Sequence, residues 1–204
     1  MTDNALRVVC LDLEGVLFPE VWIALADKTG IAELRLTTRD IADYNDLMRN
    51  RISVLDSAGI TFSYVSELIG TLEPLPGAVA FLDRLRRRRQ VIIVSDTFYQ
   101  FLSPITGKLG YPTIFCNTLL IENDRIVDFR LRQQNGKLRV VRALQELGFT
   151  VAAAGDSHND LEMIYAADYG ALFRAPDPIR AAHTALPAYT TYEELDAWER
   201  GLPQ

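Results

Sequence analysis

The chain has 204 residues, of which 49% are hydrophobic and 24% are charged, and its formal net charge is −6. This composition is typical of a folded globular protein and excludes an extended disordered chain. The negative charge argues against a nucleic-acid partner, because a phosphate backbone requires a basic protein face, and no apolar run reaches the roughly 18 residues that span a membrane.

The chain begins with Met1-Thr2-Asp3-Asn4, which has neither the basic region nor the apolar region of a secretory signal. We therefore expect a cytoplasmic protein. The two cysteines, Cys10 and Cys116, fit this compartment. Each belongs to an apolar run, so we expect both in the core rather than in a disulfide.

The first predicted element is a strand that ends on two acids. Val8 to Leu11 form an unbroken apolar run, typical of a strand buried on both faces, and Asp12, Glu14 and Gly15 follow it. Asp12 and Glu14 are two residues apart, so their side chains point to the same side. In open α/β sheets ligands bind beyond the carboxyl ends of the strands, which favours a catalytic pair. The alternative is two acids that only solvate a loop.

Three helices and no strand are predicted next. They begin near Pro19, Asp43 and Ser63, and they end near Gly30, Gly59 and Leu72. The breaker Pro74-Leu75-Pro76-Gly77 closes this helical segment. We therefore expect residues 18–75 to form a helical cap inserted into a core made of residues 1–17 and 76–204. A lid over the site is the natural use of such a cap.

Strands and helices alternate from Gly77 onward. The predicted strands are 90–94, 112–116, a hairpin over 119–132 that is broken at 122–124, then 150–154 and 170–173. The predicted helices follow Gly77, cover 98–109 and 138–147, begin again near 161, and complete the C-terminus. This alternation predicts an α/β fold with a Rossmann-like, doubly wound parallel sheet.

One basic run, Arg86-Arg87-Arg88-Arg89, stands out in an acidic chain. It ends a segment in which Phe81, Leu82 and Leu85 have helical spacing. Cations at a helix C-terminus offset the helix dipole, so we expect a solvated helix end rather than a binding site.

Polar side chains follow several predicted strands at the point where each strand ends. They are Asp12 and Glu14, Ser95, and Asp156 and Asp160, with Lys137 at the start of a helix. Because the carboxyl ends of parallel strands meet at one edge, we expect these groups to converge. Carboxylates suit Mg²⁺, and a hydroxyl and a lysine suit the oxygens of a phosphoryl group. The sequence therefore predicts phosphoryl transfer with an aspartate nucleophile.

The same residues resemble the motifs of the haloacid dehalogenase superfamily. The matching segments are Asp12-Leu13-Glu14-Gly15-Val16, Ser95, Lys137 and Gly155-Asp156-Ser157-His158-Asn159-Asp160. The helical segment resembles the first-type cap of that superfamily, as in phosphoserine phosphatases. Further likeness to the bifunctional phosphoserine phosphatase/homoserine phosphotransferase branch is carried by Pro19-Glu20-Val21-Trp22, Thr38-Arg39-Asp40 and Ser95-Asp96-Thr97.

The resemblance implies roles for the acids. Asp12 would be the nucleophile that becomes an aspartyl-phosphate, and Glu14 would be the general acid and then the general base. Asp156 and Asp12 would bind Mg²⁺ together with the backbone carbonyl of Glu14. Asp160 would not touch the metal but would hold the residues that bind it. The phosphoryl group and its surroundings would be held by Ser95, Lys137 and Asn159.

Two positions depart from the superfamily pattern. Glu14 stands where the superfamily usually has Asp, which lengthens the acid by one methylene. Asp96 stands where most phosphoserine phosphatases have glycine, which adds a carboxylate near the substrate amine. His158 lies inside the last motif at a position that the family leaves variable, so we expect a solvated loop residue there.

Arg51 gives an independent indication of the substrate. Tyr44, Met48, Arg51 and Leu55 have helical spacing, which places an arginine within a mostly apolar stripe. It is either a snorkelling side chain, a structural ion pair, or a fork for the α-carboxylate of a substrate. In the last case Glu20 would bind the α-ammonium, as in phosphoserine phosphatases. Trp22 is expected in the cap core rather than as a substrate platform.

We therefore expect a Mg²⁺-dependent phosphoserine phosphatase that acts through an aspartyl-phosphate, and that also transfers the phosphoryl group to homoserine. Its partners would be small molecules, O-phospho-L-serine and homoserine. One alternative is a phosphatase for another small metabolite. A second is a non-catalytic phospho-aspartate switch of receiver type, which would lack both Glu14 and the helical segment.

Overall fold

The computed structural model describes residues 6–37, 40–41 and 43–203. The N-terminal segment Met1 to Asn4 and the pair Thr38 and Arg39, on which expectations were placed above, lie outside the described residues. A seven-stranded sheet forms the centre of the fold, in the order β4-β3-β2-β1-β5-β6-β7. Its strands are β1 (Arg7–Leu11), β2 (Gln90–Phe98), β3 (Thr113–Glu122), β4 (Arg125–Arg130), β5 (Thr150–Gly155), β6 (Tyr169–Phe173) and β7 (Ala188–Tyr189).

All neighbouring strands are parallel except β3 and β4, which form an antiparallel hairpin. β1 lies between β2 and β5. Alternate residues of β1 enter two separate cores, Val9 and Leu11 on one face of the sheet and Val8 and Cys10 on the other. The apolar run is therefore needed on both faces, as predicted.

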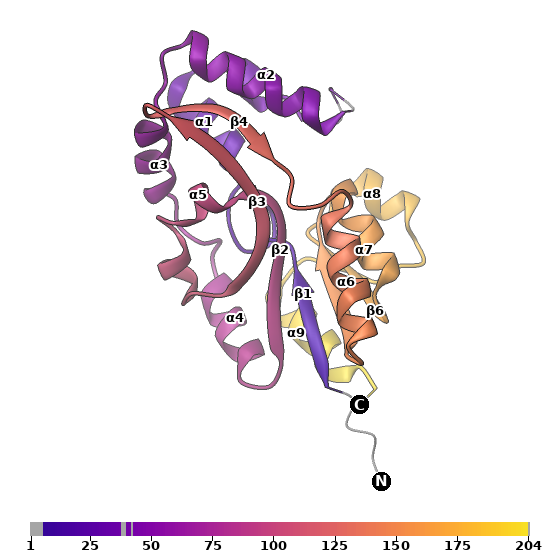
Figure 1. The fold of residues 1–204 in the computed structure, drawn as a ribbon. Helices are drawn as coiled ribbons and strands as arrows, with labels where there is room; N and C mark the ends of the chain where they lie inside the picture. Colours follow the sequence, from indigo (N-terminus) through magenta and orange to yellow (C-terminus); the bar gives the residue numbers. More distant parts are fainter. Residues whose placement is uncertain (1–5, 38–39, 42, 204) are drawn as a thin grey trace.

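Helices cover both faces of the sheet, with α6 and α7 on one side and α4 on the other (Figure 1). The α-helices are α1 (Val21–Thr29), α2 (Tyr44–Ser57), α3 (Phe62–Gly70), α4 (Ala78–Arg86), α5 (Tyr99–Leu102), α6 (Gly136–Glu146), α7 (Leu161–Ala166), α8 (Asp177–Ala182) and α9 (Tyr192–Gly201). Short 3₁₀ helices are η1 (Ala32–Arg35), η2 (Thr106–Leu109) and η3 (His158–Asp160). The predicted doubly wound α/β fold is confirmed.

The segment 18–75 carries α1, α2 and α3 close to the positions that the helical periodicity predicts, and also η1, which was not predicted. Asp43 caps α2 by accepting a hydrogen bond from the backbone N–H of Asp46 at 3.0 Å. In Figure 1, α2 lies above the tip of the β3–β4 hairpin. The carboxylate of Asp124 in that tip accepts hydrogen bonds from the backbone N–H and the hydroxyl of Ser63, at 2.8 and 2.7 Å. The hairpin therefore supports the helical segment.

Two predicted elements were wrong in detail. The helix expected over 98–109 is divided into α5 and η2, because Pro104 lies between them and cannot donate the backbone hydrogen bond that a continuous helix needs. The separate strand at 112–116 and the first arm of the hairpin form one strand, β3, which pairs with β2 and then with β4. Asn123 and Asp124 form the turn with positive φ values, as their side chains permit.

The basic run is more than a solvated helix end. Arg88 and Arg89 form ion pairs with Glu199 of α9 at 2.9 and 2.6 Å, and Arg88 also pairs with Asp196. The carboxylate of Glu199 is only 2% exposed. These contacts fasten the last helix to the core, and this was not predicted because they join segments over 100 residues apart.

Both cysteines are free, with Cys10 buried in β1 and Cys116 half-buried in β3, as expected. None of the helices in the described part of the chain has the length and apolar character that a membrane crossing requires.

Candidate active site

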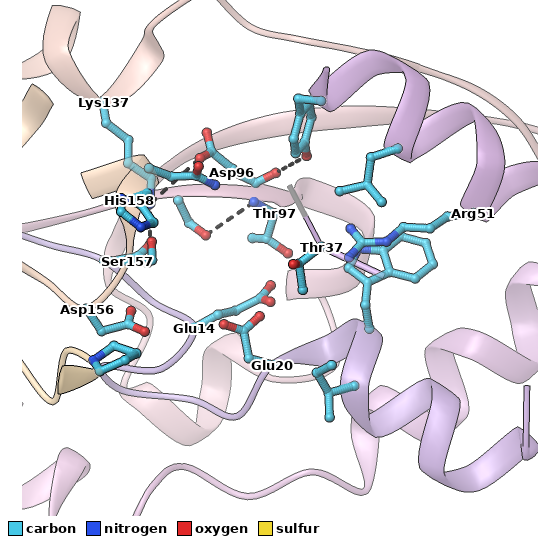
Figure 2. A pocket seen from close by; sticks show the side chains of 18 residues that line it. Glu14, Glu20, Thr37, Arg51, Asp96, Thr97, Lys137, Asp156, Ser157 and His158 are labelled. Atoms are coloured by element: carbon cyan, nitrogen blue, oxygen red, sulfur yellow. Dashed lines mark hydrogen bonds and ion pairs between the residues drawn. The ribbon is translucent and has the colours of Figure 1, made fainter. Parts of the chain in front are cut away.

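The predicted site residues converge at the carboxyl ends of β1, β2 and β5 and at the start of α6. They line one pocket of about 330 Å³ together with other residues of α1 and α2. Of the predicted set, only Asp160 does not line it, because its side chain is fully buried behind the pocket. Figure 2 shows Glu14 and Glu20 side by side, between Asp156 at one end of the pocket and Arg51 at the other.

The acids are brought together by close approach of two backbone turns. Asp12 follows β1 directly, and its N–H donates to the carbonyl of Ala154 in β5 at 3.1 Å. Gly15 has a φ of +76°, and a Cβ there would lie 2.6 Å from the carboxylate of Asp156. Gly155 is needed for the same reason, because a Cβ there would lie 2.3 Å from the side chain of Asp160.

Lys137 is the cation of this cluster. Its Nζ lies 2.9 Å from Oδ1 of Asp12, 2.7 Å from Oδ1 of Asp160 and 3.8 Å from Oδ2 of Asp96. Lys137 is the second residue of α6, so the helix start presents its ammonium group to three acids. Burial opposes its charge, but Asp12, Asp160 and Asp96 together raise the pKa of Lys137 well above its ordinary value.

Asp160 organises the loop rather than facing the pocket. Its Oδ2 accepts hydrogen bonds from the backbone N–H groups of Asp156 and Ser157, both at 3.0 Å, and from the Ser157 hydroxyl at 2.9 Å. Its Oδ1 accepts from Lys137. With both oxygens occupied, Asp160 holds the other groups in place.

The cluster of three aspartates fits a divalent cation. Carboxylate oxygens of Asp12, Asp156 and Asp160 lie within 4.8 Å of one another. Oδ1 of Asp156 is buried without a hydrogen-bond partner. Burial and Asp160 raise the pKa of Asp156 to about 7, and the same two causes raise the pKa of Asp12 well above its ordinary value despite Lys137. A hard cation would satisfy the unpaired oxygen and offset this repulsion.

Glu14 lies in the middle of the pocket with a carboxyl that favours its protonated form. Its Oε2 accepts a hydrogen bond from the N–H of Val21 at 3.2 Å, and its carboxyl also interacts with Thr97. Burial, followed by the charge and hydrogen bond of Glu20, raises the pKa of Glu14 to about 8. A carboxyl with this pKa can donate a proton near neutral pH and accept one in a later step.

Arg51 forms the opposite end of the pocket. Its guanidinium lies over the Trp22 ring, 4.7 Å from the ring centroid, and one nitrogen donates to the carbonyl of Leu36 at 2.8 Å. Within the described residues Arg51 forms no ion pair, and its Nε is buried without a partner. Arg51 is 7% exposed, so its side chain does not snorkel to the surface. Trp22 is buried in the main hydrophobic core cluster and also lines the pocket.

Ser95, Asp96 and Asn159 complete the predicted set. Ser95 is buried at the end of the β2 apolar run, where its hydroxyl accepts a hydrogen bond from the N–H of Thr97 at 3.2 Å. Asn159 is exposed at the pocket mouth. The Asp96 carboxylate faces Lys137, a contact that the sequence analysis did not foresee.

Several pocket residues were not predicted as site residues, among them Thr37, Tyr44, Thr97 and His158. Thr97 could have been found, because it is two residues from Ser95 on the same strand end. His158 is exposed, as expected, but it also lines the pocket. Thr37 lies between η1 and α2 in the chain, and no sequence pattern indicates its place at the pocket.

The chain was compared with known families and proteins. A family model described as haloacid dehalogenase-like hydrolase matches residues 6–168. A phosphoserine phosphatase of Pseudomonas syringae pv. tomato is 50% identical over 194 residues, which cover 95% of this chain and 82% of that protein. The phosphoserine phosphatase ThrH of Pseudomonas aeruginosa is 49% identical over 191 residues, 93% of each chain.

Solved structures share the fold. A phosphoserine phosphatase in apo form, 21% identical, aligns with a TM-score of 0.77 over 97% of this chain and 100% of its own. A phospho-aspartyl intermediate analogue of phosphoserine phosphatase, also 21% identical, aligns with a TM-score of 0.73 over 91% of this chain and 93% of its own. Together with the family match and the relatives near 50% identity, the motifs of this site show that the chain belongs to the haloacid dehalogenase-like hydrolases.

Proposed function

We propose that this hydrolase is a Mg²⁺-dependent phosphoserine phosphatase that acts through an aspartyl-phosphate on Asp12. The observation that carries the proposal is the two-ended pocket. One end holds an acid and lysine cluster suited to a phosphoryl group, and the other holds a buried guanidinium that forms no ion pair within the described residues. The names of the relatives at 50% and 49% identity support the same substrate.

In the first step a carboxylate oxygen of Asp12 attacks the phosphorus of the substrate. The bond from phosphorus to the serine oxygen breaks while the bond to Asp12 forms, and Glu14 donates its proton to the leaving oxygen. The raised pKa of Glu14, about 8, keeps that proton available near neutral pH.

In the second step water attacks the phosphorus of the aspartyl-phosphate. Glu14, now ionised, accepts a proton from the water, and the bond between phosphorus and Asp12 breaks to release inorganic phosphate. Both the nucleophile and the general acid are thereby restored for the next turnover.

The charge of the phosphoryl group requires several partners. Lys137, Ser95 and Asn159 would hold its oxygens. The residues that would bind Mg²⁺ are Asp12, Asp156 and the backbone carbonyl of Glu14, with Asp160 keeping them in position. When bound, Mg²⁺ supplies positive charge that neutralises the carboxylates and the phosphoryl oxygens.

The second end of the pocket would bind the amino-acid part of the substrate. We assign residues 18–75 to a cap over a core formed by 1–17 and 76–204, and the cap contributes both Arg51 and Glu20. Arg51 would bind the α-carboxylate through its planar fork, and Glu20 would bind the α-ammonium. Because Glu20 lies beside Glu14 (Figure 2), the substrate amine and the general acid would share one neighbour.

Homoserine is the second proposed acceptor. Its hydroxyl would replace water, with Glu14 accepting the hydroxyl proton as the bond from phosphorus to Asp12 breaks. Two observations favour it, the extra methylene of Glu14 and a pocket of about 330 Å³ that can hold an amino acid. One added methylene is discriminated by only ~1–3 kcal/mol, so a site for serine should admit homoserine.

The substrate assignment is tested by phosphate release from O-phospho-L-serine and from O-phosphoethanolamine, which lacks only the carboxylate. We expect Mg²⁺-dependent release, abolished by EDTA, and a kcat/KM at least about tenfold higher for phosphoserine, since charge-assisted hydrogen bonds contribute ~1.5–3 kcal/mol. Equal values would favour a phosphatase for another small metabolite. No release from any phosphomonoester, with a stable phosphorylated Asp12, would favour the receiver-type switch.

The acceptor assignment requires product analysis. With phosphoserine as donor and millimolar homoserine present, we expect phosphohomoserine to form at the expense of free phosphate. If phosphohomoserine never forms and phosphate release stays constant across the homoserine titration, the protein is a phosphatase only.

A further inference from the structure

Tyr44 joins the cap to the core next to the phosphoryl-binding end of the pocket. Its hydroxyl donates a hydrogen bond to the backbone carbonyl of Asp96 at 2.9 Å. Asp96 directly follows Ser95 on β2, and Tyr44 is the first residue of α2. In the close view of Figure 2, this contact is one of the dashed lines, and it ends on Asp96. No sequence pattern indicates this contact, because it depends on how the cap packs on the core.

The same helix carries Arg51. Tyr44 and Arg51 are seven residues apart, which is two helical turns on one face, or about 10 Å along the axis. Because α2 is a continuous helix between Tyr44 and Ser57, the position of Tyr44 determines the position of Arg51. The hydrogen bond to Asp96 therefore connects the carboxylate-binding end of the pocket with the strand end that carries Ser95.

The surroundings of Tyr44 make this contact well defined. Its ring meets Phe129 of β4 edge-on, with 6.3 Å between the centroids. The Asp96 carbonyl also accepts a hydrogen bond from Nδ2 of Asn117 at 3.0 Å, and Oδ1 of Asn117 accepts from the N–H of Arg132 at 3.0 Å. If the Tyr44 hydroxyl were removed, the carbonyl would keep Asn117 as a donor, so the loss would be local.

The far end of α2 is held more weakly. Asp56 pairs with Arg125 of the hairpin, and both side chains are about half exposed, at 53% and 54%. Exposed ion pairs contribute little to stability. The near end, through the Tyr44 hydroxyl, is the contact that can set where Arg51 stands relative to the reacting groups.

We propose that Tyr44 is a positioning residue that fixes the separation between Arg51 and the phosphoryl-binding strand ends, so that the site selects phosphomonoesters carrying a carboxylate at a set distance. This inference rests on the proposed function, since Arg51 must bind a substrate carboxylate. Tyr44 acts through Arg51 and takes no part in proton or phosphoryl transfer.

The test is Tyr44→Phe, which keeps the ring and removes the hydroxyl. On O-phospho-L-serine we expect KM to rise about five- to tenfold with kcat changed by less than about twofold, as expected for one hydrogen bond that positions a binding group. On O-phosphoethanolamine, which has no carboxylate, both constants should stay within about twofold of the parent. Tyr64→Phe on α3 and Asp56→Asn at the far end of α2 are the matched controls, each with both substrates within about twofold.

The outcomes separate this inference from the proposed function. If the parent enzyme prefers phosphoserine and Tyr44→Phe leaves that preference unchanged, the positioning role is wrong and the proposed function stands. Equal losses of kcat/KM on both substrates would mean that Tyr44 is merely structural. A melting temperature far below that of the parent would mean the same. If the parent treats both substrates alike, the proposed function fails and the role of Tyr44 fails with it.

Discussion

The Nζ of Lys137 lies 2.9 Å from Oδ1 of Asp12, although the two residues are 125 positions apart in the sequence. Burial and the charge of Asp160 raise the pKa of Asp12 well above its ordinary value despite Lys137. A nucleophilic carboxylate must be ionised, and a further positive charge at this end of the pocket would favour the ionised form. This requirement leads to the first prediction.

Mg²⁺ should stabilise the folded protein through Asp156. At about one hundred times its dissociation constant, a ligand adds about 2.7 kcal/mol, which raises the melting temperature of a chain of this length by about 5–10 °C. We expect this rise for the parent and its loss in Asp156→Asn, since the unpaired Oδ1 belongs to Asp156. Asp168→Asn, outside the pocket, serves as the control and should keep the rise. An equal rise in parent and Asp156→Asn would place the cation elsewhere.

Arg51→Lys keeps the charge and loses the planar fork. We expect kcat/KM on O-phospho-L-serine to fall by about 10–100-fold, and that on O-phosphoethanolamine by less than about threefold. Arg49→Lys, on the same helix but 70% exposed, is the matched control and should leave both values unchanged. Equal losses on the two substrates in Arg51→Lys would mean that Arg51 is structural.

Glu14→Gln should change how stability depends on pH. Burial and Glu20 raise the pKa of Glu14 from 4.5 to about 8. Folding therefore favours the protonated form of Glu14. The resulting stability is fully present below pH 4.5, the pKa of Glu14 in the unfolded chain, and is lost as the pH rises through about 8, its pKa in the folded protein. The melting temperature of the parent should therefore fall relative to Glu14→Gln between about pH 5 and pH 8, measured with EDTA and without substrate. A difference that stays constant over this range would contradict the raised pKa.

The site residues from the strand ends could be predicted from the sequence. Asp12, Ser95 and Asp156 each follow a short apolar run, and parallel strands bring their carboxyl ends to one edge. Lys137 was predicted from its place at the start of a helix, and Arg51 from its place within a mostly apolar helical stripe. In each case the local pattern already determines which way the side chain points.

Contacts between distant segments could not be predicted. The hydrogen bond from Tyr44 to Asp96 and the ion pairs of Arg88 and Arg89 with Glu199 depend on how separately formed elements dock. No periodicity or motif in the sequence encodes such docking. The division of the helix expected over 98–109 was different, because Pro104 was visible and its effect on backbone hydrogen bonding was underestimated.

The central claim is that Asp12 is the nucleophile, and Asp12→Asn tests it most directly. The substitution keeps the shape of the side chain and leaves Lys137 its contact with Asp160, so the melting temperature should stay close to that of the parent. Phosphate release from O-phospho-L-serine with Mg²⁺, measured on the same preparation, should fall by at least about a thousandfold, or ~4 kcal/mol of barrier. A folded Asp12→Asn variant that retains activity within about tenfold of the parent, or ~1.4 kcal/mol, would contradict the covalent mechanism.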